Sequence, residues 1–583
     1  MELEHLGGFP RPDMMRRELQ SLEGEWGFEY DAADAGIAGG WSSRPEFSRR
    51  ITVPFCVESE ASGIGDAYPP RVAWYAKDFR NELPGTPGRT LLHFGAVDYR
   101  ARVWLNGRDL GEHAGGYTPF TFDVGEALED ENILVVRVED SRDASQPRGK
   151  QTMLKRAFMV WYPGVSGIWQ PVWLERAGEV YLAGYRVLAD LKSGRVRIVC
   201  SLAGGRGEAR VEAKSVSPLG EARHCRTELE KGAETAVVEL ELDLGELLPW
   251  SPHEPHLYGL ELSVESGATR DEVEAYFGVR EVRAHEGGIW LNGEPLYQKL
   301  VLCQGYFPQG HYTPLDPSWY RRDVALVKEL GFNGLRMHQK IEDPRFLFWC
   351  DYLGCLVWEE MPSAYRFTPR MREALEREWR EVLERDGNHP SIIALVAFNE
   401  SWGVGVFPLP LNLRRATREY VRKICRLTRL WDPTRPVIDN SGYEHTSETD
   451  IVDIHHYLED EERCAHLYEE LRDLTQSEYS LRRGLVAILQ AKVSHNPLAK
   501  GERYRGQPVI ISEYGGFGYY RGGEGRSLQE SYRAYTELIQ AQEHICGYCY
   551  TQLYDLYQER NGLLGFDRVP KVPVEEIRRV NEV

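Results

Sequence analysis

The most constraining feature of the sequence is a regular alternation of apolar runs and helix-like stretches through its last 290 or so residues. Eight runs have the near-continuous apolar character of strands covered on both faces, at 296–302, 331–337, 356–361, 392–399, 436–440, 451–457, 508–513 and 545–552. Helix-like stretches lie between them, at 318–330, 344–353, 370–385, 412–430 and 528–542. This pattern predicts a (β/α)8 TIM barrel over residues 283–583, with a doubly wound parallel sheet as the alternative.

The residues before the predicted barrel have the pattern of two β-sandwiches. In residues 1–178, short runs of β-branched and aromatic residues recur between turn signals, and we expect a jelly-roll β-sandwich there. Asn106 and Gly107 separate two of these runs and indicate a hairpin, because both tolerate the positive φ angles of a type I′ turn. Residues 179–282 form a second β-rich block of the size and pattern of an immunoglobulin-like sandwich.

The charge balance argues against several classes of partner. Seventy Lys and Arg residues face ninety Asp and Glu residues, which gives a net charge of −20 without any basic run. Such a chain is repelled by phosphate backbones and anionic lipid, so we expect neither a nucleic-acid nor a membrane partner. The first residues lack the basic and apolar regions of a signal peptide, and the ten cysteines are scattered without a disulfide spacing. We therefore expect a cytoplasmic protein.

Polar side chains stand at the ends of five of the eight predicted barrel strands. They are Arg336 and His338 after the second strand, Glu360 after the third, Asn399 and Glu400 after the fourth, Tyr457 after the sixth and Glu513 after the seventh. Active sites of such barrels form at the C-terminal strand ends, so we expect these groups to share one charged pocket. Aromatic residues near the same ends are candidates for its apolar walls: Trp358, Trp402 and Tyr514.

Two carboxylates facing each other across a barrel suit the cleavage of a glycosidic bond. One protonates the leaving oxygen, and the other attacks the sugar or stabilises its developing positive charge. We expect Arg336 and Tyr457 to hydrogen-bond Glu513 and hold it ionised. Glu400, close to that negative charge, is then expected to have a raised pKa and to act as the acid. Asn399 is placed to bind the 2-hydroxyl of the sugar.

Neither a metal nor a cofactor is expected. His338, His455 and His456 could act as ligands, but no metal-binding helix motif or cysteine cluster accompanies them in the sequence. The sequence also lacks a complete phosphate-binding loop motif. We place His338 and Glu360 among the candidate substrate-binding residues instead.

The residues that carry this chemistry resemble glycoside hydrolase family 2, and the resemblance runs over nearly the whole chain. Segments 115–120 and 166–175 resemble the family's N-terminal sugar-binding sandwich, and 250–258 resembles its immunoglobulin-like domain. Segments 332–338, 399–400, 512–515 and 550–555 resemble its barrel motifs. The resemblance implies that Glu400 is the acid/base and Glu513 the nucleophile of a retaining exo-β-glycosidase. Family members include β-galactosidases, β-glucuronidases and β-mannosidases.

Several positions depart from the familiar family patterns and bear on the substrate. Trp161 stands where β-galactosidases and β-glucuronidases usually carry an Asp that reaches the pocket, and Leu563 stands where the glucuronidases carry Lys. Gln552 lies where the indole on the eighth strand is expected. An acidic sugar could still be bound by other cations, of which the candidates are Lys340, Arg345 and Arg560.

Two functional hypotheses remain open at this point. The first is a retaining exo-β-glycosidase that resembles β-galactosidases and acts on short oligosaccharides or glycosides. Within it, a β-uronidase, an arabinofuranosidase or a mannosidase is the alternative. The second is a non-catalytic carbohydrate-binding protein. In both cases the partner is a carbohydrate, and a homo-oligomer is possible.

Overall fold

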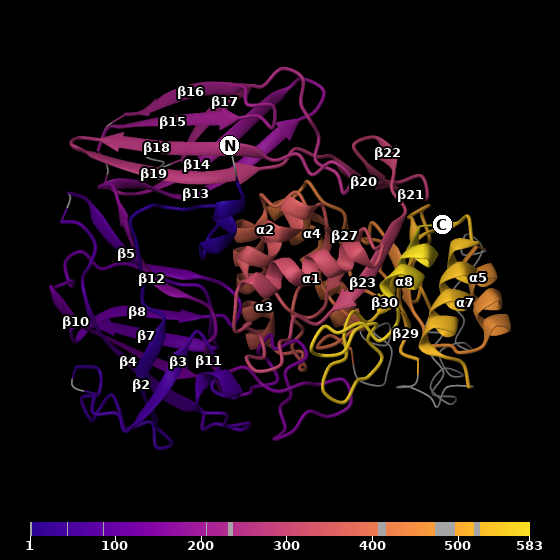
Figure 1. Cartoon of the computed structure of the whole chain (residues 1–583), viewed down its shortest axis with the longest axis horizontal. Coiled ribbons are helices and arrows are strands. Elements are labelled where there is room, and N and C mark those ends of the chain that lie inside the picture. The colour runs from indigo at the N-terminus through magenta and orange to yellow at the C-terminus, as the bar shows by residue number, and fades with distance from the viewer. Residues whose placement is uncertain are drawn as a thin grey trace.

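A computed structural model describes residues 3–43, 45–85, 87–205, 207–230, 237–405, 415–472, 496–517 and 525–582. They form three units (Figure 1), with one sandwich at the lower left, a second at the top and the barrel on the right. No helix among the described residues is both long and apolar enough to cross a membrane. The exact domain boundaries given above stay predictions.

The first unit is a sandwich of two antiparallel sheets that enclose an apolar core. One sheet has the order β1-β12-β5-β9 and the other the order β3-β2-β4-β10-β7-β8. Their strands are β1 (Leu19–Ser21), β2 (Gly24–Tyr30), β3 (Arg49–Val53), β4 (Val72–Arg80), β5 (Arg89–Phe94), β7 (Arg100–Leu105), β8 (Arg108–Ala114), β9 (Phe120–Asp123), β10 (Glu131–Glu139) and β12 (Val172–Ala177). The predicted hairpin is confirmed, because β7 and β8 pair around Asn106 and Gly107, which have φ angles of 53° and 79°.

The second unit is also a two-sheet sandwich with its own core. The sheets have the orders β13-β14-β17 and β16-β15-β18-β19. The strands are β13 (Val180–Asp190), β14 (Arg195–Gly204), β15 (Ala209–Val216), β16 (Ala222–Leu229), β17 (Val237–Asp243), β18 (Tyr258–Ser266) and β19 (Thr269–Phe277). Buried and exposed residues alternate along β17, as expected for a strand with one face toward a core.

The third unit is a barrel of eight parallel strands in the order β27-β26-β25-β24-β23-β30-β29-β28. The strands are β23 (Gln298–Cys303), β24 (Gly334–Met337), β25 (Leu356–Glu360), β26 (Ile392–Val396), β27 (Val437–Ile438), β28 (Val452–His455), β29 (Val509–Gly515) and β30 (Ile545–Thr551). Chain order runs around the sheet, and the first strand pairs with the last. All eight predicted strands are therefore confirmed, and the sheet is nearly closed rather than doubly wound.

Helices cover the outside of the barrel (Figure 1). They are α1 (Ser318–Glu329), α2 (Pro344–Leu353), α3 (Pro369–Asp386), α4 (Arg415–Trp431), α5 (Glu461–Arg472), α7 (Leu528–Gln540) and α8 (Val574–Asn581). The five predicted helices are present, although the predicted start of α4, at 412–414, lies outside the described residues. The sequence analysis missed α5 and α8. α8 has only eight residues and buries Ile577, Val580 and Asn581. α5 has twelve residues, and its buried Cys464, Leu467, Tyr468 and Leu471 recur at helical spacing, so a signal for it was available.

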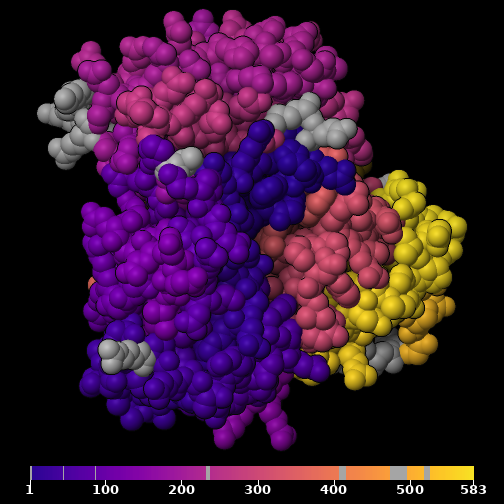
Figure 2. All heavy atoms as spheres, turned by 60° about the vertical axis from the view of Figure 1, so that its left-hand side comes forward, coloured from indigo at the N-terminus to yellow at the C-terminus, as the bar shows by residue number. Residues whose placement is uncertain are grey.

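One segment of the first sandwich reaches the barrel, and we call residues 148–163 the bridging segment. The backbone N–H groups of Arg148 and Gly149 both donate to the carbonyl of Ser363 at 3.0 Å. Gly149 has a φ of +56°, and a Cβ there would lie 1.9 Å from the carbonyl oxygen of Gln339, so the contact requires glycine. The N-terminal residues add a second link, since Leu3 and Leu6 pack into the barrel core; Figure 2 shows this indigo segment in the seam between the units.

Candidate active site

Glu513 lies near the end of β29 with its side chain 6% exposed. Nη1 of Arg336 donates to its Oε1 at 2.9 Å. The Tyr457 hydroxyl donates to its other oxygen, Oε2. Both contacts predicted from the sequence are present, so each carboxylate oxygen of Glu513 accepts a hydrogen bond.

Arg336 holds several of the other predicted residues in place from the centre of the barrel, where it is fully buried. Its Nε donates to a carboxylate oxygen of Glu360 at 2.9 Å, and its Nη2 donates to the side-chain amide oxygen (Oδ1) of Asn399 at 2.8 Å. Burial alone would raise the pKa of Glu360, but the charges of Arg336 and His338 and their hydrogen bonds lower it to about 2. This end of the barrel is therefore built around one guanidinium shared by two carboxylates and an amide.

Glu400 follows β26 in a left-handed conformation with a φ of 47°, and its side chain is 24% exposed. Its Oε1 lies 2.9 Å from Nδ1 of His455, which ends β28. Burial favours the neutral carboxyl, but the hydrogen bond from His455, with a further contribution from the charge of Lys150, lowers the pKa of Glu400 to about 2. The predicted raised pKa is wrong for this state, because these two side chains outweigh burial and the negative charge of Glu513.

His455 stands between the two glutamates. Its Nε2 lies 3.4 Å from Oε1 of Glu513 and accepts a hydrogen bond from Arg336 Nη1 at 3.0 Å, which leaves Nδ1 to donate to Glu400. One oxygen of each glutamate and a His455 nitrogen lie within 4.8 Å of one another. The two carboxyl groups are therefore close, as they are in glycosidases that retain configuration, where the groups lie about 5–5.5 Å apart. The three atoms could also hold a cation, which would have to compete with Arg336 for Glu513.

Asn399 and His338 complete the inner part of the site. Asn399 is 1% exposed, its carbonyl oxygen accepts from Arg336, and its Nδ2 has no hydrogen-bond partner within the described residues. An unsatisfied buried donor is costly, which favours a ligand oxygen as its partner. His338 Nδ1 lies 3.1 Å from Glu360 and 4.0 Å from Glu513. Burial, with the charges of Lys150 and Arg336, lowers the pKa of His338 despite the opposing effect of Glu360.

The bridging segment supplies the outer part of the site. Trp161 stacks on Trp402, with ring centroids 5.5 Å apart, and its Nε1 donates to the Tyr365 hydroxyl at 2.8 Å. Nζ of Lys150 lies over the Trp402 ring, 4.5 Å from its centroid. The aromatic wall expected at Trp402 therefore exists, and half of it comes from the first sandwich.

Three other predicted residues do not line the site. Tyr514 points outward from β29, where its hydroxyl bonds Thr536 of α7 at 2.6 Å. Trp358 is fully buried in the barrel core and donates to Gln298 at 2.7 Å. All three N–H groups of Lys340 are taken, by Glu342 at 2.6 Å and by the carbonyls of residues 305 and 312 at 2.7 and 3.2 Å. Lys340 therefore cannot bind an acidic sugar without breaking a buried ion pair.

Two of the remaining candidates are hydrogen-bonded to other residues of the protein, and one is exposed on a loop. Gln552, at the end of β30, is 1% exposed and donates to Asn561 Oδ1 at 2.9 Å. Arg345 is buried and forms a two-pronged ion pair with Asp343, at 2.8 and 2.7 Å. Arg560 is exposed on the loop after β30, so its role stays a prediction.

The sequence analysis missed two residues of the site, His455 as a partner of Glu400 and Lys150. A signal for His455 was available, because alternation along a strand puts it on the same face as Tyr457 and turns His456 outward. His456 indeed bonds the Tyr468 hydroxyl of α5 at 2.7 Å. Lys150 had no local signal, since its place depends on how two domains dock.

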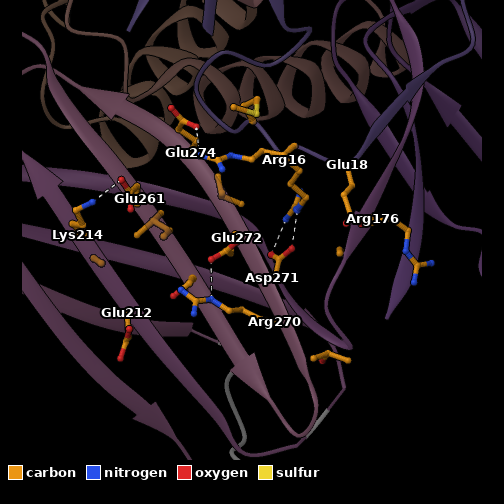
Figure 3. A pocket seen from close by; sticks show the side chains of 18 of the residues that line it. Arg16, Glu18, Arg176, Glu212, Lys214, Glu261, Arg270, Asp271, Glu272 and Glu274 are labelled. Atoms are coloured by element: carbon orange, nitrogen blue, oxygen red, sulfur yellow. Dashed lines mark hydrogen bonds and ion pairs between the residues drawn. The ribbon is translucent and has the colours of Figure 1, made fainter. Parts of the chain in front are cut away.

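A separate cleft of about 1120 Å³ lies between the two sandwiches (Figure 3). Arg16 at its base is 3% exposed and binds Asp271 through two N–H groups, at 2.9 and 3.0 Å, and Glu175 at 3.1 Å. At its mouth, Lys214 pairs with Glu261 at 2.8 Å. The cleft is large, but these charges neutralise one another and none of the predicted catalytic residues lines it.

Comparison with known families assigns all three units. Residues 19–175 match the sugar binding domain of glycosyl hydrolases family 2, and residues 282–559 match the TIM barrel domain of that family. Residues 180–280, the second sandwich, match a further domain model described as glycosyl hydrolases family 2. The predicted family and fold class are confirmed.

Individual relatives are more distant. A β-galactosidase of Thermoanaerobacter pseudethanolicus is 28% identical over 381 residues, which is 63% of this chain and 48% of the relative. A β-galactosidase of Pectobacterium atrosepticum is 26% identical over 483 residues, 76% of this chain and 44% of the relative. The chain thus spans about half the length of the curated relatives it matches. The structure of a β-glucuronidase from Ruminococcus gnavus superposes with a TM-score of 0.75 at 19% identity, covering 98% of this chain and 99% of that one, which shows a shared fold.

Proposed function

The chain belongs to glycosyl hydrolases family 2, and from this membership we propose that it is a retaining exo-β-glycosidase that hydrolyses terminal β-linked sugars. The observation that carries the proposal is the pair Glu400 and Glu513 at the C-terminal barrel end, with oxygens within 4.8 Å. Carboxyl groups this close support double displacement, since an inverting enzyme holds a water between carboxyls about 6.5–9.5 Å apart.

In the first step, an oxygen of Glu513 attacks the anomeric carbon while the glycosidic C–O bond breaks. Glu400 gives its proton to the leaving oxygen, and the sugar is left as an ester of Glu513. In the second step, Glu400 takes a proton from water, the water oxygen attacks the anomeric carbon, and the ester bond breaks. Arg336 and Tyr457 stabilise Glu513 as it leaves. The free amide hydrogens of Asn399 bind a sugar hydroxyl.

The hydrogen bond from His455 serves the second step, because it stabilises ionised Glu400 as the base. The first step needs the protonated form. Substrate binding covers the exposed quarter of the Glu400 side chain, and this desolvation raises its pKa. We infer that the acid form is favoured in the complex rather than in the free protein.

The sugar most consistent with the relatives is a β-galactoside, since both β-galactosidases above match large parts of this chain. A uronide, a mannoside or an arabinofuranoside is the alternative, because Trp161 and Leu563 depart from the familiar patterns. A non-catalytic carbohydrate-binding protein is less consistent with the site, since Asn399, Glu400 and Glu513 are all present with their partners.

The test is a set of initial hydrolysis rates on 4-nitrophenyl glycosides. The panel holds β-galactoside, β-glucuronide, β-galacturonide, β-mannoside, β-glucoside and α-arabinofuranoside, each with wild type and Glu513→Gln. We expect one glycone to be cleaved well by wild type only, with the β-anomer of the sugar released first in a proton NMR time course. Full activity in Glu513→Gln, or release of the α-anomer from a β-glycoside, would contradict the proposal.

A further inference from the structure

Lys150 is a buried cation without an acidic partner. The residue is 8% exposed, and among the described parts of the chain no carboxylate lies within 4.0 Å of its Nζ. The Nζ of Lys150 instead lies over the face of Trp402, 4.5 Å from the ring centroid. Lysine is rarely buried to this extent unless it is paired, because an ammonium loses most of its hydration. A ligand anion could therefore bind at Lys150, since none of the described carboxylates lies within 4.0 Å of its Nζ.

The other buried cations at this end of the barrel do have partners. Arg336 binds Glu360 and Glu513, while Lys340 binds Glu342 at 2.6 Å. Lys150 is different because it comes from another domain and meets an aromatic ring in place of an acid.

The backbone around Lys150 is fixed relative to the barrel. Its carbonyl accepts the N–H of Tyr162 at 2.9 Å, and the neighbouring Gly149 is pressed against the Gln339 carbonyl, where no side chain fits. These contacts set where the Lys150 side chain starts, and the Trp402 ring lies under its end.

Lys150 also lies beside the loop that carries Glu400. Trp402, whose ring lies under its Nζ, follows Glu400 by two residues, and Trp161 of the bridging segment stacks on the same ring. In keeping with this position, the positive charge of Lys150 contributes to the lowered pKa of Glu400.

We propose that Lys150 binds a carboxylate of the substrate, with Trp402 as the apolar surface beneath it. This inference rests on the proposed glycosidase function and specifies the substrate class as an acidic glycoside. Two sources carry the same chemistry: a terminal sugar that is itself a uronic acid, and a carboxylate on the leaving group next to Glu400. The experiment below separates them.

The test uses two matched pairs of substrates. The first pair differs in the sugar, a 4-nitrophenyl β-galacturonide against the β-galactoside, with the glucuronide and glucoside beside them. The second pair differs in the leaving group, a 4-carboxyphenyl against a 4-carbamoylphenyl glycoside of the sugar that wild type prefers. Each is measured with wild type, Lys150→Met, Lys150→Arg and the control Lys155→Met, which removes an exposed lysine from the same segment.

We expect Lys150→Met to lower the acidic-to-neutral ratio of kcat/KM by about 30- to 1000-fold in one of the two pairs, as the loss of one partner of a buried charge pair predicts. Lys150→Arg should restore part of the ratio, and Lys155→Met should leave it as in wild type. A change in the first pair identifies a uronide, and a change in the second identifies an acidic leaving group. An unchanged ratio in both pairs would overturn the inference.

Calorimetric binding of galacturonate, glucuronate and galactose separates this inference from the proposed function. If wild type hydrolyses nothing but binds a sugar acid that Lys150→Met does not bind, the glycosidase proposal fails and the Lys150 site stands. If wild type hydrolyses glycosides but the variant keeps both the ratio and the binding, the Lys150 site fails alone.

Discussion

The cleft between the sandwiches and the C-terminal end of the barrel are both rich in charge, but they differ in how the charge is satisfied. In the cleft, Arg16 is bound by Asp271 and Glu175, and Lys214 is paired with Glu261. At the barrel end, Lys150 has no acidic partner among the described residues and Asn399 keeps an unbonded amide nitrogen. The charges named in the cleft are thus paired with one another, whereas the barrel end holds polar groups without such partners. Buried polar groups without partners are a better guide to a ligand site than size is.

The largest expected effect comes from the two glutamates of the barrel end. Glu513→Gln should lose at least about 10⁴-fold in kcat/KM on every substrate, because no other group can form the sugar ester. Glu400→Gln should lose about 10²–10⁴-fold on glycosides with poor leaving groups and much less on a 2,4-dinitrophenyl glycoside, whose leaving oxygen needs no proton. The measurement is a series of aryl glycosides of graded phenol pKa. A leaving-group dependence in Glu513→Gln instead of Glu400→Gln would reverse the two roles.

At the cleft, substitution should change stability and leave turnover alone. Arg16→Met removes the cation between two buried carboxylates, and we expect a loss of about 3–5 kcal/mol in the free energy of unfolding. Urea denaturation measures it, and kcat/KM per folded molecule should stay within about twofold of wild type. A strong loss of activity without a loss of stability would give the cleft a part in function.

The pH dependence of stability should also come from the cleft. His93 and Arg16 lower the pKa of buried Glu175 to about 2, against an ordinary value of 4.5. Because the folded pKa is the lower one, the stabilisation is present above about pH 4.5 and is lost as the pH falls toward 2. The stability difference between wild type and Glu175→Gln should shrink by about 2 kcal/mol from pH 5 to pH 3. A constant difference would show that Glu175 titrates normally.

The smallest effect is expected at the mouth of the cleft. Lys214 and Glu261 are 37% and 48% exposed, and exposed pairs contribute at most about 1 kcal/mol. Lys214→Met should therefore change the free energy of unfolding by less than that, and the change should vanish in about 1 M salt. Lys214→Met serves as the control for Arg16→Met. An equal change in the free energy of unfolding in both variants would show that buried and exposed ion pairs of the cleft contribute alike to stability.

Most of the barrel could be predicted from the sequence because parallel strands that are covered on both faces consist of near-continuous apolar residues. The residues at their ends could be predicted for the same reason, since strand ends converge on one edge. Arg336, Asn399, Glu400, Tyr457 and Glu513 are brought together in this way.

Other parts of the site depend on contacts that no local pattern records. Lys150 reaches the barrel only because Gly149 fits against Gln339, about 190 residues away in the chain. The predicted direction of the Glu400 pKa shift was wrong for a related reason. The shift sums several interactions, and two of them come from Lys150 and His455, which lie far from Glu400 in the sequence.

Because of the bridging segment, the groups that react and the groups that line the outer part of the site come from different domains, whereas many enzymes carry both on the same loops. The reacting carboxylates sit at strand ends of the barrel, while Lys150 and Trp161 belong to another domain. A lineage could therefore replace the outer wall by substitution in residues 148–163 and leave the carboxylates untouched. In such a chain, selectivity and chemistry evolve as separate modules, and a recombined first sandwich would bring a new preference to an unchanged barrel.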